Sequence, residues 1–141
     1  MEEIKRFNVR VYGLLFDADQ RILTTIENIK GKTYRKFPGG GLEWGEGTRD
    51  CLKREFLEEL NLPIEVEEHL YTTDFFVESA FSFSDQVISI YYKVKALQEI
   101  NLKTLKSSEI ELLELDWIHS HKMTEELFNF PIDKQLVKLL F

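Results

Sequence analysis

Apolar and polar residues alternate along several stretches of the chain, and this alternation predicts β-strands. The first stretch runs from Phe7 to Phe16 and becomes densely apolar toward its end, as expected of a strand that enters a core. Turn-forming residues follow at 17–20, and residues 21–27 are expected to be the antiparallel partner of this first strand. A short strand ending at Phe37 comes next, and stretches rich in β-branched and aromatic residues predict later strands at 64–76, 86–97 and 111–118.

A helical period replaces the alternation in residues 48–60. This segment contains neither Gly nor Pro, its apolar residues recur every four positions, and Thr48 is the expected N-cap. Terminal helices are predicted over 123–128 and 132–141, the second of them after a proline at a tolerated position. Strands, a helix, more strands and closing helices in this order indicate the α/β class, a sandwich with helices on both faces of a mixed β-sheet.

The composition narrows the range of functions. With 141 residues, of which 43% are hydrophobic, the chain is expected to form one domain over residues 1–141. A net charge of −7 and a pI near 5.0 oppose stable binding to nucleic acid or to an anionic membrane, because both need a basic surface. Cys51 is the only cysteine and the first residues lack an apolar signal segment, so we expect a soluble, unprocessed protein in the reducing cytoplasm.

The loop at residues 38–47 is acidic although it is rich in glycine. It holds five of the seven glycines together with Glu43 and Glu46. Glycine loops often bind phosphate, yet this one lacks the lysine of a P-loop and the spacing of a dinucleotide fingerprint. Its glutamates would repel a bare phosphate, so an anionic ligand would need a cation to accompany it.

The helix predicted after this loop carries Glu55, Glu58 and Glu59, which project within an arc of about 100° on one side. Like charges at this spacing destabilise a helix, and acids near its C-terminal end oppose its dipole. Mg²⁺ or Mn²⁺ would offset that cost, because each takes oxygen ligands and keeps positions open for water and phosphates. An isolated E-x-x-E-E is more often a solvated face with partners such as Lys53, but the glycine loop at a fixed distance favours the metal site.

Gly40, Glu46 and residues 54–62 resemble the Nudix box, G-x5-E-x7-R-E-U-x-E-E-x-G-U, in which U is an aliphatic residue. The resemblance covers 23 residues directly, and the flanking strands and closing helix suit the Nudix α/β/α sandwich with its mixed sheet. Phe56 replaces an aliphatic residue of the pattern. Asn61 replaces its glycine, and asparagine is the next-best residue for the left-handed conformation that ends a helix.

The resemblance implies roles for the acidic residues and for one arginine. Glu55, Glu58 and Glu59 would be the metal ligands, and the last two would also take part in catalysis. Glu46 would support these ligands, and Arg54 would orient the groups around them.

Nudix proteins often add a carboxylate from a later strand or loop, either as a further metal ligand or as the base that activates water. Glu111 is the candidate for that role in this chain. The alternatives for the same role are Glu109, Glu114, Glu78 and Asp85.

Substrate contacts are expected next to the glycine loop and on one aromatic loop. Either Arg35 or Lys36 could contact a phosphate, because both directly precede the glycines. Phe76 is the candidate for stacking on a nucleobase, among several phenylalanines between residues 75 and 83. The backbone positions expected to lie against the substrate are Gly39, Gly40 and Gly41.

The function implied is metal-dependent hydrolysis of a phosphoanhydride in a nucleoside diphosphate linked to another group. A sensor that binds a nucleotide or sugar without cleaving it is the second hypothesis, and a purely structural acidic domain is the third. The sequence leaves the substrate open among ADP-ribose, nucleotide sugars, dinucleoside polyphosphates and nucleoside triphosphates. It also leaves the oligomeric state open, a homodimer included.

Overall fold

The computed structural model describes residues 5–82, 84–100 and 111–141, with residues 111–113 described by their backbone alone. The helices are α1 (Thr48–Leu60) and α2 (Pro131–Leu140), and two short 3₁₀ helices, η1 (Ser120–Lys122) and η2 (Glu125–Leu127), precede α2. The strands are β1 (Arg6–Leu15), β2 (Arg21–Ile29), β3 (Lys32–Lys36), β4 (Gly39–Gly41), β5 (Ile64–Thr72), β6 (Asp85–Ala96) and β7 (Glu111–His119).

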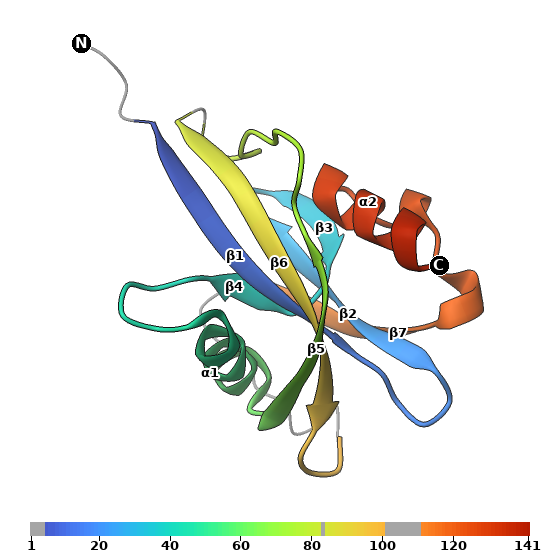
Figure 1. Ribbon diagram of the computed structural model, residues 1–141. Helices are drawn as coiled ribbons and strands as arrows, with labels where there is room; N and C mark the ends of the chain where they lie inside the picture. The colour runs from blue at the N-terminus through green and yellow to red at the C-terminus, as the bar shows by residue number, and fades with distance from the viewer. Residues whose placement is uncertain (1–4, 83, 101–110) are drawn as a thin grey trace.

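Two sheets form the centre of the fold (Figure 1). The first is mixed, in the order β4-β1-β6-β5, with β1 parallel to β6 and the other neighbours antiparallel. The second, in the order β3-β2-β7, is antiparallel throughout. The helices α1 and α2 lie on opposite sides of the strands (Figure 1), which confirms the predicted α/β/α sandwich with a mixed sheet.

The pairing expected between the first two strands is wrong. Across the turn at residues 17–20, β1 and β2 are joined by a single bridge between Phe16 and Ile22, and they then enter different sheets. The hydrogen-bonding edges of β1 are taken by β4 and β6. This central position suits a strand that is buried on both faces, with Val11 in the core cluster of α1 and Tyr12 in that of α2.

The helix α1 packs on the mixed sheet through an apolar ridge that includes the fully buried Phe56. Its N-cap is Gly47, not the expected Thr48, because the Thr48 hydroxyl is hydrogen-bonded to the Tyr92 hydroxyl at 2.7 Å. The helix ends at Asn61, whose φ of 51° and ψ of 37° confirm the left-handed conformation expected there. The buried ridge fixes which face of α1 carries the glutamates.

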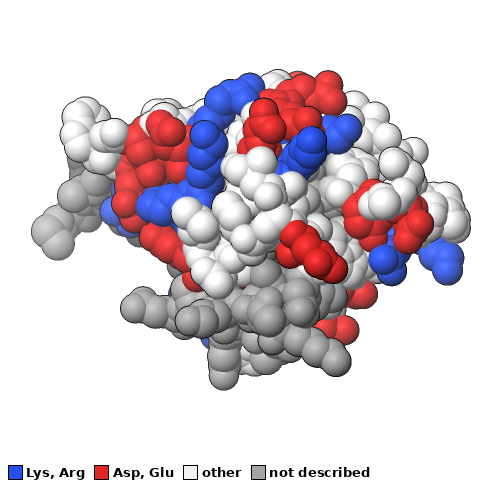
Figure 2. All heavy atoms as spheres, turned by 90° about the horizontal axis from the view of Figure 1, so that it is seen from below, with Lys and Arg blue, Asp and Glu red and all other residues white. Residues whose placement is uncertain are grey.

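The helix expected over residues 123–128 is also wrong. The segment holds only the one-turn η2, and its buried apolar residues, Met123 and Phe128, would lie about 140° apart around an α-helix, on different faces. The last helix is confirmed as α2, which starts at Pro131. No helix among the described residues has the length and apolar character needed to cross a bilayer. On the face in Figure 2, acidic and basic side chains lie next to one another, so its charge is mixed.

Candidate active site

The acidic glycine stretch begins as a strand, although a loop was expected. Gly39–Gly41 form β4, which pairs antiparallel with β1. A Cβ atom on Gly39 would collide with the carbonyl of Val11, and a φ of 150° at this residue also favours glycine. A Cβ atom on Gly40 would collide with the carboxylate of Glu55. The glycines therefore let a carboxylate of α1 approach the backbone of β4.

Arg54 connects this stretch to α1. Its guanidinium donates to Glu46 through Nε at 3.0 Å and through Nη2 at 2.7 Å, and Nη2 also donates to the Gly41 carbonyl at 3.1 Å. Its Nη1 donates to Glu55 at 3.0 Å and to Glu58 at 3.1 Å. The hydrogen bonds from Arg54 lower the pKa of Glu46 to about 2. The structure thus brings Glu46, Glu55 and Glu58 into one network around Arg54.

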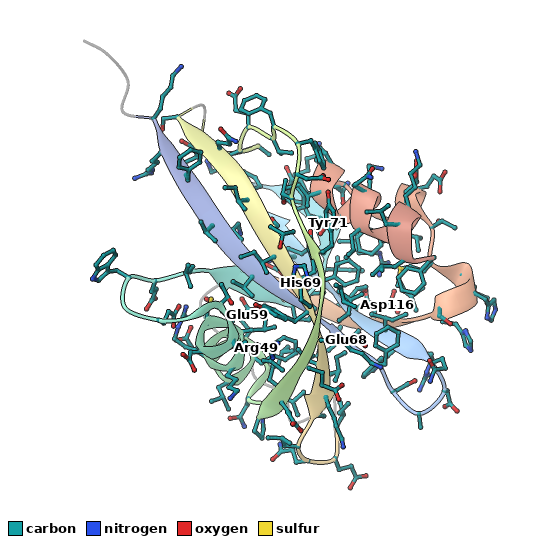
Figure 3. The ribbon with its side chains drawn as sticks, in the orientation of Figure 1. Arg49, Glu59, Glu68, His69, Tyr71 and Asp116 are labelled. Carbon is teal, nitrogen blue, oxygen red and sulfur yellow. The ribbon has the colours of Figure 1, made fainter. Side chains whose placement is uncertain are left out.

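The glutamates of α1 differ in their surroundings. The side chain of Glu58 is 52% exposed and that of Glu55 is 13% exposed, whereas Glu59 is 8% exposed and faces β4 and β1 (Figure 3). Burial raises the pKa of Glu59 to about 8. The charge of Lys36 opposes this rise, whereas the carboxylates of Glu27 and Glu55 reinforce it.

These carboxylates have the chemistry of a site for a hard divalent cation. All donors are oxygens, and a buried carboxyl group next to other carboxylates is an arrangement that a bound cation would stabilise. In the part of the chain that the structure describes, no three Asp, Glu, His or Cys side chains converge closely enough to enclose a metal ion. Arg54 forms ion pairs with Glu55 and Glu58. For a metal ion to bind, these two glutamates would have to leave Arg54 and turn toward the metal.

A cavity of about 490 Å³ opens where β1 and β6 face the ends of β2 and β3. The loop at residues 77–81 and the start of α2 complete its walls. Its aromatic rim consists of Phe81 and Phe130, whose ring centres lie 6.0 Å apart, with Tyr34 stacked on Phe130 at 5.0 Å. A volume in the range of about 300–1,000 Å³ is typical of small-molecule sites.

Arg10, Tyr12, Glu27 and Lys36 form a polar wall of this cavity. Arg10 Nε donates to the Tyr12 hydroxyl at 2.6 Å, and Lys36 Nζ lies 3.4 Å from Glu27 Oε2. Burial alone would lower the pKa of Lys36, but the Tyr12 phenol and the nearby carboxylates, Glu27 among them, leave it above its usual value. Lys36 is therefore a buried cation.

A further buried carboxyl group lines the cavity at the start of α2. The Tyr91 hydroxyl donates to Asp133 Oδ1 at 2.6 Å. Burial raises the pKa of Asp133 to about 6, against the hydrogen bond from Tyr91 and the charges of Lys36 and Arg10. The charges of Lys36 and Arg10 act on Glu59 as well, so the two cations interact with carboxyl groups of both α1 and α2.

The two phosphate candidates before the glycines face opposite sides of β3. Lys36 lines the cavity, whereas Arg35 is outside its lining. Arg35 Nη1 donates to Asp116 Oδ2 at 2.9 Å and to Thr24 Oγ1 at 2.8 Å, and Asp116 lies on β7 (Figure 3). The Arg35 guanidinium is therefore already paired, on the side of β3 that faces away from the cavity.

The nucleobase candidate Phe76 is 69% exposed and does not line the cavity, whereas Phe81 of the same loop does. Glu111 is placed by its backbone alone, which pairs with Asn28 of β2, a residue of the cavity lining. Of the alternatives to Glu111, Glu78 lines the cavity, Asp85 pairs with Arg6 at 2.7 Å, Glu114 is exposed and Glu109 lies outside the described residues.

Sequence reasoning did not select Arg10, Tyr12, Glu27 or Asp133. Arg10 and Tyr12 are alternate residues of one strand, and this spacing was the available signal that both face one side. Glu27 and Asp133 offer no such signal, because a buried carboxylate and a solvated one look alike in a sequence.

Comparison with known proteins places this geometry in a family. A family model for the NUDIX domain matches residues 6–140. The mouse protein "nucleoside diphosphate-linked moiety X motif 6" is 31% identical over 134 residues, which cover 94% of this chain and 41% of that protein. The chain therefore spans about two fifths of the length of this relative.

Solved structures share the fold. The MutT protein from Methanosarcina mazei superposes with a TM-score of 0.76 at 17% identity, covering 98% of this chain and 95% of its own. An ADP-ribose pyrophosphatase from Streptococcus suis superposes with a TM-score of 0.65 at 16% identity, covering 94% of this chain and 87% of its own. At these identities the likeness concerns the fold.

Proposed function

The chain belongs to the Nudix family, and from that premise we propose that it is a metal-dependent pyrophosphohydrolase with one catalytic domain over residues 1–141. Its substrate would be a nucleoside diphosphate linked to another moiety, and water would attack phosphorus. One observation carries the proposal. The buried Glu59 interacts with Arg10 and Lys36, and these two cations line a cavity of about 490 Å³.

The metal would be Mg²⁺ or Mn²⁺, held by Glu55, Glu58 and Glu59. When bound, it would neutralise charge on the phosphates and lower the pKa of a water molecule. Glu46 supports this set through Arg54, which pairs with Glu46 and with two of the three glutamates. Arg54 would therefore act as the residue that positions the acidic side chains.

The substrate would lie with its phosphates at α1 and its nucleoside in the cavity. The backbone of Gly39–Gly41 would run beside the phosphates, as the close contact between Gly40 and Glu55 suggests. Lys36 is better supported than Arg35 as a phosphate contact, since it lines the cavity. For the same reason, Phe81 is better supported than Phe76 as a stacking partner.

A base is needed to take a proton from the attacking water. Glu111 remains the candidate proposed for this role, and its backbone position opposite Asn28 brings it to the strand that borders the cavity. Glu78 is the alternative that lines the cavity. We propose a cytoplasmic location on the basis of composition, and we leave a homodimer as a question for solution measurement.

A nucleotide sensor is the second candidate function. The observation in its favour is that Arg54 pairs with both Glu55 and Glu58, which keeps two of the three expected ligands occupied. In a sensor this pairing would persist when the nucleotide binds, whereas in the enzyme the metal would displace it.

The test is product release from ADP-ribose, nucleotide sugars, dinucleoside polyphosphates and nucleoside triphosphates, with and without Mg²⁺ or Mn²⁺. Glu59→Gln should abolish metal-dependent turnover, and Glu65→Gln, an exposed glutamate of β5, is the matched control. Turnover that survives chelation, or that persists in Glu59→Gln, would contradict the proposal. Binding of a panel member without turnover would replace the enzyme with the sensor.

A further inference from the structure

Glu27 is a buried carboxylate in the lining of the cavity. The residue is 2% exposed. Its Oε2 accepts a hydrogen bond from Thr25 Oγ1 at 2.6 Å and lies 3.4 Å from Lys36 Nζ. Its Oε1 has no hydrogen-bond partner among the described residues. A buried acceptor left without a partner is costly, and a ligand that donates to it would recover that cost.

The cavity is where such a donor could reach Glu27, because the side chain is part of its lining. The last torsion of a glutamate has a broad energy profile, so rotation of the carboxylate can present either oxygen to the cavity. A metal ion is a poor occupant at this point, since Lys36 lies beside the carboxylate and Arg10 shares the same wall. A neutral hydroxyl donor meets no such repulsion.

We propose that Glu27 accepts a hydrogen bond from a ribose hydroxyl of the substrate while Lys36 and Arg10 contact the adjoining phosphate, so that the site discriminates against a sugar that lacks this hydroxyl. The inference rests on the proposed function, which places the phosphates at α1. In a nucleotide the ribose is bonded directly to the phosphate. An acceptor beside the phosphate-binding cations therefore faces the sugar, and the base extends toward Phe81 and Phe130 at the rim.

Thr25 gives a way to disturb Glu27 without touching the ligand. Its hydroxyl donates to Glu27 Oε2, so Thr25→Val frees the carboxylate from its position. Thr24 is the matched control. It is equally buried on the neighbouring position of β2, but its hydroxyl donates to the Asp116 carbonyl and accepts from Arg35, away from the cavity.

The experiment is calorimetric binding of nucleoside monophosphates to the full chain in the presence of Mg²⁺, since monophosphates contain no anhydride to cleave. The four common ribonucleoside 5′-monophosphates are measured first, and the tightest is then compared with its 2′-deoxy and 3′-deoxy forms. We expect one deoxy form to bind about 10- to 100-fold more weakly, as for a hydrogen bond to a charged group.

The variant Glu27→Leu with Lys36→Met removes both partners, so that no lone charge stays buried. It should bind all three forms more weakly and equally. Thr25→Val should reduce the preference for the ribonucleotide, and Thr24→Val should retain it.

Equal binding of the ribo and deoxy forms by the unmodified protein would overturn the inference, as would no binding at millimolar concentration. A preference that survives in the double variant would also overturn it. The outcome is separate from catalysis. If the protein hydrolyses a substrate but shows no ribose preference, only the ribose contact is refuted. If it shows a preference that depends on Glu27 but no turnover, only the hydrolase activity is refuted.

Discussion

The carboxylate of Glu55 lies against Gly40 so closely that a single methyl group at Gly40 would occupy the same space. Glu55 belongs to α1 and Gly40 to β4, so the lack of a side chain at Gly40 leaves room for a carboxylate of the helix beside the strand. The close approach of the Glu55 carboxylate to the strand backbone therefore depends on glycine, the residue without a side chain, at position 40.

Gly40→Ala should therefore displace Glu55 and weaken metal-dependent turnover. The atoms in the way are the flexible end of the Glu55 side chain, which can move aside, so the unfolding free energy should fall by less than the roughly 1–3 kcal/mol of an overpacked core. Denaturant unfolding checks the stability, and Gly41→Ala is the control for stability, because a Cβ there meets Arg10 Nη1 at an ordinary 3.6 Å. Unchanged metal-dependent turnover in Gly40→Ala would mean that the position of Glu55 beside Gly40 does not matter for the site.

Arg54→Lys tests the network that joins the loop to the helix. Lysine cannot reproduce a guanidinium that donates to Glu46, Glu55 and Glu58 together, so turnover should fall by about 10-fold or more while the fold persists. Lys53→Met, at the exposed neighbouring position, should leave both turnover and thermal stability near the original values. Full activity in Arg54→Lys would show that the positioning role is unnecessary.

The buried Asp133 should make stability depend on pH. Its pKa is raised by burial from 3.8 to about 6, so the folded protein holds the proton more tightly than the unfolded chain does. The contribution of this group to stability is therefore complete below pH 4 and is lost as the pH rises through about 6.

Asp133→Asn removes this titration and keeps an acceptor for Tyr91. Between pH 4 and pH 7 the unfolding free energy of the variant should rise relative to that of the original protein by up to about 3 kcal/mol. This follows from about 1.4 kcal/mol per pKa unit. Urea unfolding at a series of pH values checks the difference curve. A difference that stays flat across this interval would contradict the buried, raised pKa.

Asn61 offers a test of how α1 ends. Its left-handed backbone should make Asn61→Ala less stable by about 1 kcal/mol, while Asn61→Gly should be neutral or slightly stabilising. Thermal unfolding of the two variants side by side gives the comparison. If alanine were tolerated as well as glycine, backbone strain at this position would not matter.

The acidic network could be predicted from the sequence because its spacing is local. The helical period places the glutamates of α1 on one side, and Gly40, Glu46 and Arg54 follow at fixed distances along the chain. The structure brings these residues together as that spacing implies.

The cavity could not be predicted in the same way. Arg35 and Lys36 are adjacent and chemically similar, and which one faces the cavity depends on the register of β3 with β2. Strand pairing also depends on distant segments. Because β1 pairs with β6 and β2 with β7, the pairing expected between the neighbouring β1 and β2 was wrong. Which side chains form the polar wall therefore depends on tertiary contacts, which a local sequence pattern does not reveal.

The parallel pairing of β1 with β6 also determines when the protein can fold. Arg6 pairs with Asp85, which lies 79 residues further along the chain. The paired residues of β2 and β7 are separated by even more of the sequence. On the ribosome, β1 therefore has no β6 to pair with until residues 85–96 have been made. Neither sheet can close before β6 and β7 have been made, so the cavity, whose walls come from both sheets, would form only then.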